Sequence, residues 1–180
     1  MKKLLIALAA VLVTATTFGQ GTLNFSTKVG TDVDAPVVIA GTQNGPGPLW
    51  SAQLYLSSNG SLTALTPATT FRDGSANPAA AKYVVPAGTV TVPGVNSGNP
   101  ASIVMRAWLT SLNGFDAAKA SGSGLGESAP LTVTLGGGLL PDANLSGLQG
   151  FSVSPANVPE PSIIALGVLG ASALLLRRRK

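Results

Sequence analysis

The chain has 180 residues, of which 45% are hydrophobic and only 10% are charged, and it contains neither histidine nor cysteine. These absences exclude a Ser-His-Asp triad, a Cys-His dyad, a histidine-ligated zinc, a thiolate metal site and any disulfide. The net charge of +4 comes from the two ends, which hold six of the eleven cations; between Gln20 and Val158 five cations face six acids, so the sequence indicates no basic surface for nucleic acid.

Residues 1–19 have the pattern of a secretory signal peptide. Lys2 and Lys3 form a positive n-region, residues 4–13 are apolar, and small residues and threonines follow. We therefore expect an N-terminal signal helix that engages the secretion translocon and is cut by signal peptidase near Gly19 and Gln20. A permanent N-terminal anchor is the alternative, because the residues before Gly19 are not an ideal cleavage context.

Residues 20–157 are long enough for one domain with its own core. Glycine and proline together number 30 in this stretch, which favours short strands joined by many turns. The predicted fold class is all-β, an antiparallel β-sandwich of the immunoglobulin-like or jelly-roll kind. The only helix expected in this body is residues 115–120. The expected strands are residues 22–26, 36–40, 50–57, 62–65, 69–72, 82–85, 88–95, 102–110, 131–135 and 151–154.

Two of these strands show clear alternation and are the best candidates for the centre of a sheet. The residues predicted to share one face are Trp50, Ala52, Leu54 and Leu56 in the first strand, and Ile103, Met105, Ala107 and Leu109 in the second. Asn59-Gly60 and Asn113-Gly114 are hairpin-turn signals after these strands.

The body offers one weak candidate for a metal site. Asp32 and Asp34 are alternate residues, whose side chains point the same way in an extended segment, and carboxylate oxygens suit calcium. A solvated turn before the next strand is the alternative interpretation. We expect no resident metal and no cofactor.

The glycine-rich residues 122–126 superficially resemble a phosphate-binding loop. No strand is predicted closely before them and no helix after them, so the sequence favours a flexible linker.

Carbohydrate binding or carbohydrate chemistry is the alternative function for the body. Trp50, Tyr55 and Trp108 could stack on sugar rings, although aromatic residues in strands more often belong to the core. Glycoside hydrolysis would require two of the six scattered carboxylates to converge. We therefore expect no catalytic residue and a protein that is not an enzyme.

The last 23 residues are the most informative segment. Residues 162–176 carry no charge and span roughly 22 Å as a helix at about 1.5 Å per residue, modestly short of a bilayer core of about 30 Å. We predict a transmembrane helix here, because a buried core helix would not end in four cations. The cations stay on the cytoplasmic side and place the body outside. They are Arg177, Arg178, Arg179 and Lys180.

The triplet that precedes this helix completes a pattern. Val158, Pro159, Glu160 and Pro161, then the short apolar span, then the arginine cluster resemble the PEP-CTERM sorting domain of bacterial exported proteins. The resemblance covers residues 158–180 and implies recognition by an exosortase, a membrane transpeptidase that cleaves near the triplet. It implies a transient anchor in the inner membrane, followed by transfer of the body to the cell surface or its release.

A looser resemblance extends over most of the chain. Short segments of the body are similar to exported PEP-CTERM proteins of Verrucomicrobia-type bacteria, which implies a shared β-rich fold and no particular activity. We therefore expect an exported, membrane-anchored or surface-released, non-enzymatic protein that contributes to an extracellular matrix with extracellular polysaccharide as a partner. The similar segments are residues 21–25, 52–55, 92–95, 106–108, 126–128 and 147–149.

Overall fold

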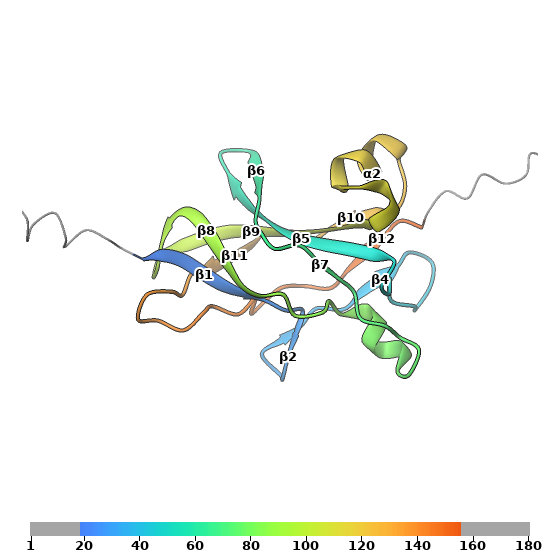
Figure 1. The fold of residues 1–180 in the computed structure, drawn as a ribbon, viewed down its shortest axis with the longest axis horizontal. Helices are drawn as coiled ribbons and strands as arrows, with labels where there is room; N and C mark the ends of the chain where they lie inside the picture. Colours follow the sequence, from blue (N-terminus) through green and yellow to red (C-terminus); the bar gives the residue numbers. More distant parts are fainter. Residues whose placement is uncertain (1–18, 156–180) are drawn as a thin grey trace, which may run out of the picture.

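The computed structural model describes residues 19–155 (Figure 1). The predicted signal helix, the sorting motif from Val158 to Pro161, the transmembrane helix and the basic terminus lie outside the described residues, apart from Gly19 at the boundary. Within the described part, no helix has the length and hydropathy needed to cross a membrane. The elements are β1 (Gln20–Phe25), β2 (Lys28–Val29), β3 (Val33–Asp34), β4 (Val37–Ile39), β5 (Trp50–Ser58), β6 (Ser61–Ala64), β7 (Thr69–Thr70), the 3-10 helix η1 (Pro78–Lys82), β8 (Gly88–Asn96), β9 (Pro100–Leu109), the 3-10 helix η2 (Thr110–Leu112), α2 (Phe115–Ser121), β10 (Leu125–Glu127), β11 (Leu131–Thr134) and β12 (Phe151–Val153).

The two strands with the clearest alternation lie at the centre of the largest sheet, as predicted. β5 and β9 pair antiparallel, and β6, β7, β10 and β11 pair with one or the other of them. In β5, Trp50, Ala52 and Leu54 are buried, whereas the intervening residues are partly exposed. The predicted all-β class and the antiparallel character of the main sheet are therefore confirmed.

β9 buries side chains on both of its faces. Met105 faces the main core, while Trp108, on the opposite face, packs with Phe115 and Ala118 of α2. Figure 1 shows α2 lying over the part of the main sheet that contains β10. The predicted helix at residues 115–120 is thus confirmed, and it covers the part of the outer face around Trp108.

Isolated backbone bridges connect the sheets into a closed circuit. Phe71, next to β7, forms a bridge with Val84, and from Val84 the chain itself continues into β8. β8 pairs with β1, and Thr22 of β1 forms a second bridge with Gly136, which follows β11. β11 pairs with β9, which returns the circuit to β5 and β7. One continuous core fills its interior, and its largest fully buried side chains are Phe25, Phe71, Leu23, Leu54, Leu65, Ile103, Met105, Leu135 and Leu145.

Several local predictions are wrong. The strand expected at residues 82–85 is replaced by the end of η1 and a single bridge at Val84. Asn113-Gly114 forms no hairpin: Asn113 ends η2 in the left-handed conformation, and Gly114 precedes α2. The pair β4–β12 is parallel, whereas the sequence indicated antiparallel pairing only.

The interpretation of residues 122–126 as a flexible linker is also wrong. Gly122 caps the C-terminus of α2 in the left-handed region (φ 71°), a conformation that glycine adopts without a Cβ clash. The chain then enters β10, which pairs with β9. The glycines therefore permit a tight helix-to-strand connection, and no phosphate loop is formed.

Candidate functional site

Of the residues predicted to be involved in processing, Gly19 and Gln20 belong to the described part of the chain. Both are exposed, and Gln20 begins β1. The carbonyl oxygen of Gly19 accepts a hydrogen bond from the amide of Ser97 (3.0 Å), and Gln20 pairs with Asn96 at the far end of β8. Backbone pairing thus begins at the predicted cleavage position.

The other end of the described chain is fixed to the body by a cluster of backbone bonds. The amide of Ser154 donates to the carbonyl of Leu125 (2.8 Å), and the amide of Leu125 donates to the Ser154 hydroxyl oxygen (3.2 Å). The amide of Gly124 donates to the carbonyl of Pro155 (3.3 Å). Pairing therefore continues to Pro155, three residues before Val158.

These two ends lie at opposite ends of the long axis of the body. Figure 1 shows the blue beginning of β1 at the left and the red segment that follows β12 at the right. A protein held through the segment after β12 would therefore present the beginning of β1 at its far end.

Asp32 and Asp34 do not converge on a common ligand position. The Asp32 carboxylate accepts from the Ser146 hydroxyl (2.7 Å) and from the Asn144 amide (2.9 Å). The Asp34 carboxylate pairs with Lys28 Nζ (2.8 Å) and accepts from the Tyr83 hydroxyl (2.7 Å). Within residues 19–155 no three acidic side chains form a group that could hold a metal ion. Asp32 lies in the turn between β2 and β3, whereas Asp34 belongs to β3 and lies opposite Lys28, so the turn interpretation describes only Asp32.

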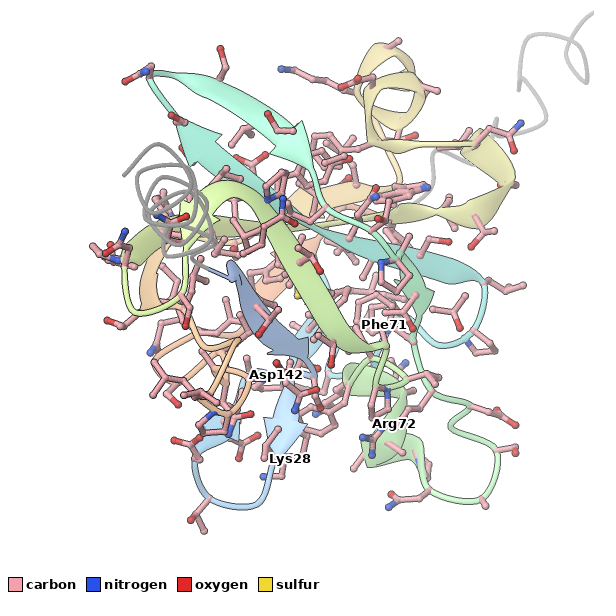
Figure 2. The ribbon with its side chains drawn as sticks, turned by 60° about the vertical axis from the view of Figure 1, so that its left-hand side comes forward. Lys28, Phe71, Arg72 and Asp142 are labelled. Atoms are coloured by element: carbon pink, nitrogen blue, oxygen red, sulfur yellow. The ribbon has the colours of Figure 1, made fainter. Side chains whose placement is uncertain are left out.

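A third carboxylate, Asp142, lies against β1 and β8 (Figure 2). It accepts from the Thr22 hydroxyl of β1 (2.5 Å) and from the Thr89 hydroxyl of β8. Two residues later, the side-chain oxygen of Asn144 accepts from Asn24 of β1 (3.2 Å). Polar side chains thus fasten the loop after β11 to the outer face of β1. No local sequence pattern indicates this contact, because Thr22 and Asp142 are 120 residues apart.

Hydrogen bonds hold the pKa of four aspartates below the ordinary value. The cause is the Ser146 hydroxyl for Asp32, the Lys28 ammonium for Asp34, the Ser75 hydroxyl for Asp73 and the Thr22 hydroxyl for Asp142, in each case the largest contribution. These four side chains are therefore fully ionised near neutral pH. A general acid requires the opposite, a carboxyl pKa raised toward neutrality. The four aspartates are suited to fastening loops rather than to donating protons.

The aromatic residues that could form a sugar-stacking surface are mostly enclosed. Trp50 is 4% exposed and Trp108 is 7% exposed, and both belong to hydrophobic clusters. Tyr55 is partly exposed, and burial raises the pKa of its hydroxyl. The Tyr55 ring, however, faces the Arg106 guanidinium, whose Cζ lies 4.9 Å from the ring centroid. Of the three candidates, only Tyr55 could reach a ligand in this arrangement.

Arg106 itself is a residue that the sequence did not single out. Its Cζ lies 4.2 Å from the centroid of Phe115, on α2, and its Nε is 2.5 Å from a carboxylate oxygen of Glu127, on β10. The guanidinium therefore joins β5, α2 and β10 on the outer face of β9. Glu127 pairs with the charge of the guanidinium, and the rings of Tyr55 and Phe115 contact its planar group. Arg106 therefore has a structural role.

No protein-family model, no curated protein and no solved structure matches this chain.

Proposed function

We propose that this protein is exported and that its C-terminal segment is a PEP-CTERM sorting signal, which holds the body at the membrane before transfer to the cell surface or release. One observation carries the proposal: Pro159-Glu160-Pro161, an uncharged span at residues 162–176 and four consecutive cations stand in that order at the end of the sequence. An apolar span followed by cations halts in a bilayer with the cations inside.

The processing route follows from this order of segments. The translocon passes the N-terminal segment, signal peptidase cuts near Gly19 and Gln20, and residues 162–176 stop transfer. An exosortase-type transpeptidase then cleaves near Pro159-Glu160-Pro161. The arrangement of the body is compatible with this route, because its strands use residues 20–153, so both cuts would leave them intact; a cut after Gly19 would remove one backbone bond, from Ser97 to Gly19.

We further propose that the body is a β-sandwich without enzymatic activity that serves in an extracellular matrix. Support for the sandwich comes from the single core enclosed between β5–β9 and β1–β8. Support for a non-enzymatic role comes from the absence of histidine and cysteine and from four aspartates whose pKa values are lowered. Extracellular polysaccharide is the proposed partner of this protein in that matrix.

Two measurements in the producing cell test the sorting proposal. Mass spectrometry of the mature protein should find an N-terminus near Gln20 and a C-terminus near Pro161. Deletion of residues 158–180 should move the protein from the membrane and surface fractions to the soluble fraction outside the inner membrane. As a matched control, replacing the four terminal cations by glutamine keeps the triplet and the apolar span and tests the stop signal alone. An uncut chain, or an unchanged location after the deletion, would refute the proposal.

A further inference from the structure

One edge of β8 has no backbone partner among the described residues. On β1, the amides of Thr22 and Asn24 donate to the carbonyls of Gly136 (3.0 Å) and Ala143 (2.7 Å), on the side away from β8. Successive residues of a strand direct their backbone groups to opposite edges. The backbone groups of Leu23 therefore face β8.

The register between β1 and β8 then fixes which groups of β8 point outward. Leu23 is opposite Val90, and Gly21 is opposite Val92, so these two valines bond to β1. Thr89 and Thr91 consequently direct their N–H and C=O groups to the other edge. No backbone bond between described residues involves either threonine, and both side chains are exposed.

The open part of this edge has two clear limits. Before β8, the same edge of the chain is covered by β7, where the amide of Val85 donates to the carbonyl of Thr70 (2.8 Å). After Val92, the β1–β8 register shifts, and Pro93 has no amide hydrogen. Among the described residues, a regular edge without a backbone partner therefore runs from Thr89 to Val92, after Gly88, which has a positive φ of 77°.

The strand itself carries none of the charged side chains that usually prevent pairing between copies; the Asp142 carboxylate bonds to the Thr89 hydroxyl, a side-chain contact that leaves the outward backbone groups of Thr89 free. No charged residue occurs between Lys82 and Arg106, whereas natural edge strands are commonly blunted by lysine or other charges. Val90 and Val92 are 0% exposed, so burial fixes the position and register of the edge. β6 also has an edge without a partner among the described residues, but every side chain of that four-residue strand is exposed or half-exposed. Burial therefore does not fix the position of the β6 edge as it does that of β8.

We propose that β8 pairs antiparallel with β8 of a second copy of this chain, about a two-fold axis through Val90. In this register Thr89 of each copy lies opposite Thr91 of the other, and every outward N–H of the two threonines meets a C=O. The two edge strands bring no charged side chain of their own into the contact. Because a two-fold contact uses the same edge on both copies, assembly stops at a dimer.

The absence of cysteine permits a direct test on the full-length chain in mild detergent. Residues opposite each other in a hydrogen-bonded antiparallel pair, here Thr89 and Thr91, have Cα atoms about 5.5 Å apart, within disulfide range. Thr89 of one copy and Thr89 of the other, and likewise the two copies of Thr91, lie beyond the limit of about 7 Å. A mixture of Thr89→Cys and Thr91→Cys chains should form a disulfide-linked dimer under mild oxidation. Each variant alone should not, and neither should a mixture of Thr89→Cys with Ser61→Cys, a control at the start of β6.

A second pair of variants separates loss of pairing from loss of folding. Thr91→Pro removes an outward N–H and no bond to β1, so the dimer should disappear in sedimentation while circular dichroism stays unchanged. Ala64→Pro is the matched control, because the Leu65 amide bonds to Leu54 (2.8 Å), which directs the Ala64 amide away from β5; its dimer should persist. A monomeric unsubstituted chain, cross-linking of Thr91→Cys alone, or a dimer that survives Thr91→Pro would overturn the proposal.

Discussion

Gly126 of β10 lies directly against the backbone of Ser152 in β12: a Cβ on the glycine would stand 2.7 Å from the Ser152 carbonyl oxygen and 2.9 Å from the Cα of Val153. Side chains do not approach backbone atoms this closely. The last strand before the C-terminal segment can therefore lie against β10 only because residue 126 has no side chain.

Gly126→Ala should destabilise the body by about 1–3 kcal/mol, the usual range for overpacking, because β10 and β12 must separate to admit the methyl group. Urea unfolding followed by circular dichroism measures this loss. Gly19→Ala is the control, since a Cβ there would make only ordinary contact at 3.4 Å with Gly138. Equal stability of the two variants would contradict the close approach of β10 and β12.

The close approach of β10 and β12 could not be predicted from the sequence, because it depends on the tertiary structure. Alternation predicted the burial of β5, and Asn59-Gly60 correctly predicted the hairpin between Ser58 and Ser61. Those signals are local. The sequence does not predict β10, because it has only three residues and lies in a glycine-rich segment; it is a strand because it pairs with β9, and the carbonyl of Leu125 accepts from the Ser154 amide just after β12 (2.8 Å).

The polar contacts of the body were unpredictable for the same reason. Asp32 and Asp34 were singled out as neighbours in sequence, yet the structure directs them to Ser146 and Lys28, respectively. Asp142 and Arg106 were not singled out, because their partners become neighbours only when distant strands pair. Exclusions based on composition, such as the absence of histidine and cysteine, need no tertiary structure and hold independently of it.

Leu145→Ala should cost about 2–5 kcal/mol in the free energy of unfolding, the range for deleting a buried leucine side chain. Leu145 is 0% exposed and belongs to the main core, although it lies in the loop after β11. Leu139, in the same loop, is fully exposed (105%), so Leu139→Ala should change stability by less than about 0.5 kcal/mol. Thermal and urea unfolding of both variants would check the difference, and similar losses would show that the loop does not close the core.

Asp142→Asn should alter how stability depends on acid. Because the pKa of Asp142 is lowered in the folded state by the Thr22 and Thr89 hydroxyls, its contribution is complete above the ordinary value of 3.8 and is lost as pH falls through the lowered folded value. The stability difference between the unsubstituted chain and the variant should thus be constant near neutral pH and shrink below about pH 3.8. Urea midpoints measured from pH 7 to pH 2 give this difference directly; parallel curves down to the lowest pH would contradict the assignment.

Arg106→Lys should destabilise the body even though the charge is kept. The guanidinium lies between the rings of Tyr55 and Phe115, and its Nε meets Glu127, an arrangement that requires a planar cation. Loss of the ring contacts should cost about 0.5–2 kcal/mol in the free energy of unfolding, because the arginine side chain is only 15% exposed.

Arg72→Lys provides the matched control for this substitution. Arg72 Nε donates to the carbonyl of Val84 (3.0 Å), and within the described residues its guanidinium lies over no aromatic ring. Its replacement should therefore cost less than that of Arg106 in the same urea titration. A double-mutant cycle of Arg106→Lys with Phe115→Leu isolates the ring contribution, since the two losses should fall short of additivity if the guanidinium stacks on Phe115. Strict additivity would show that Arg106 does not stack on Phe115 and would remove the guanidinium as the link between α2 and the sheet.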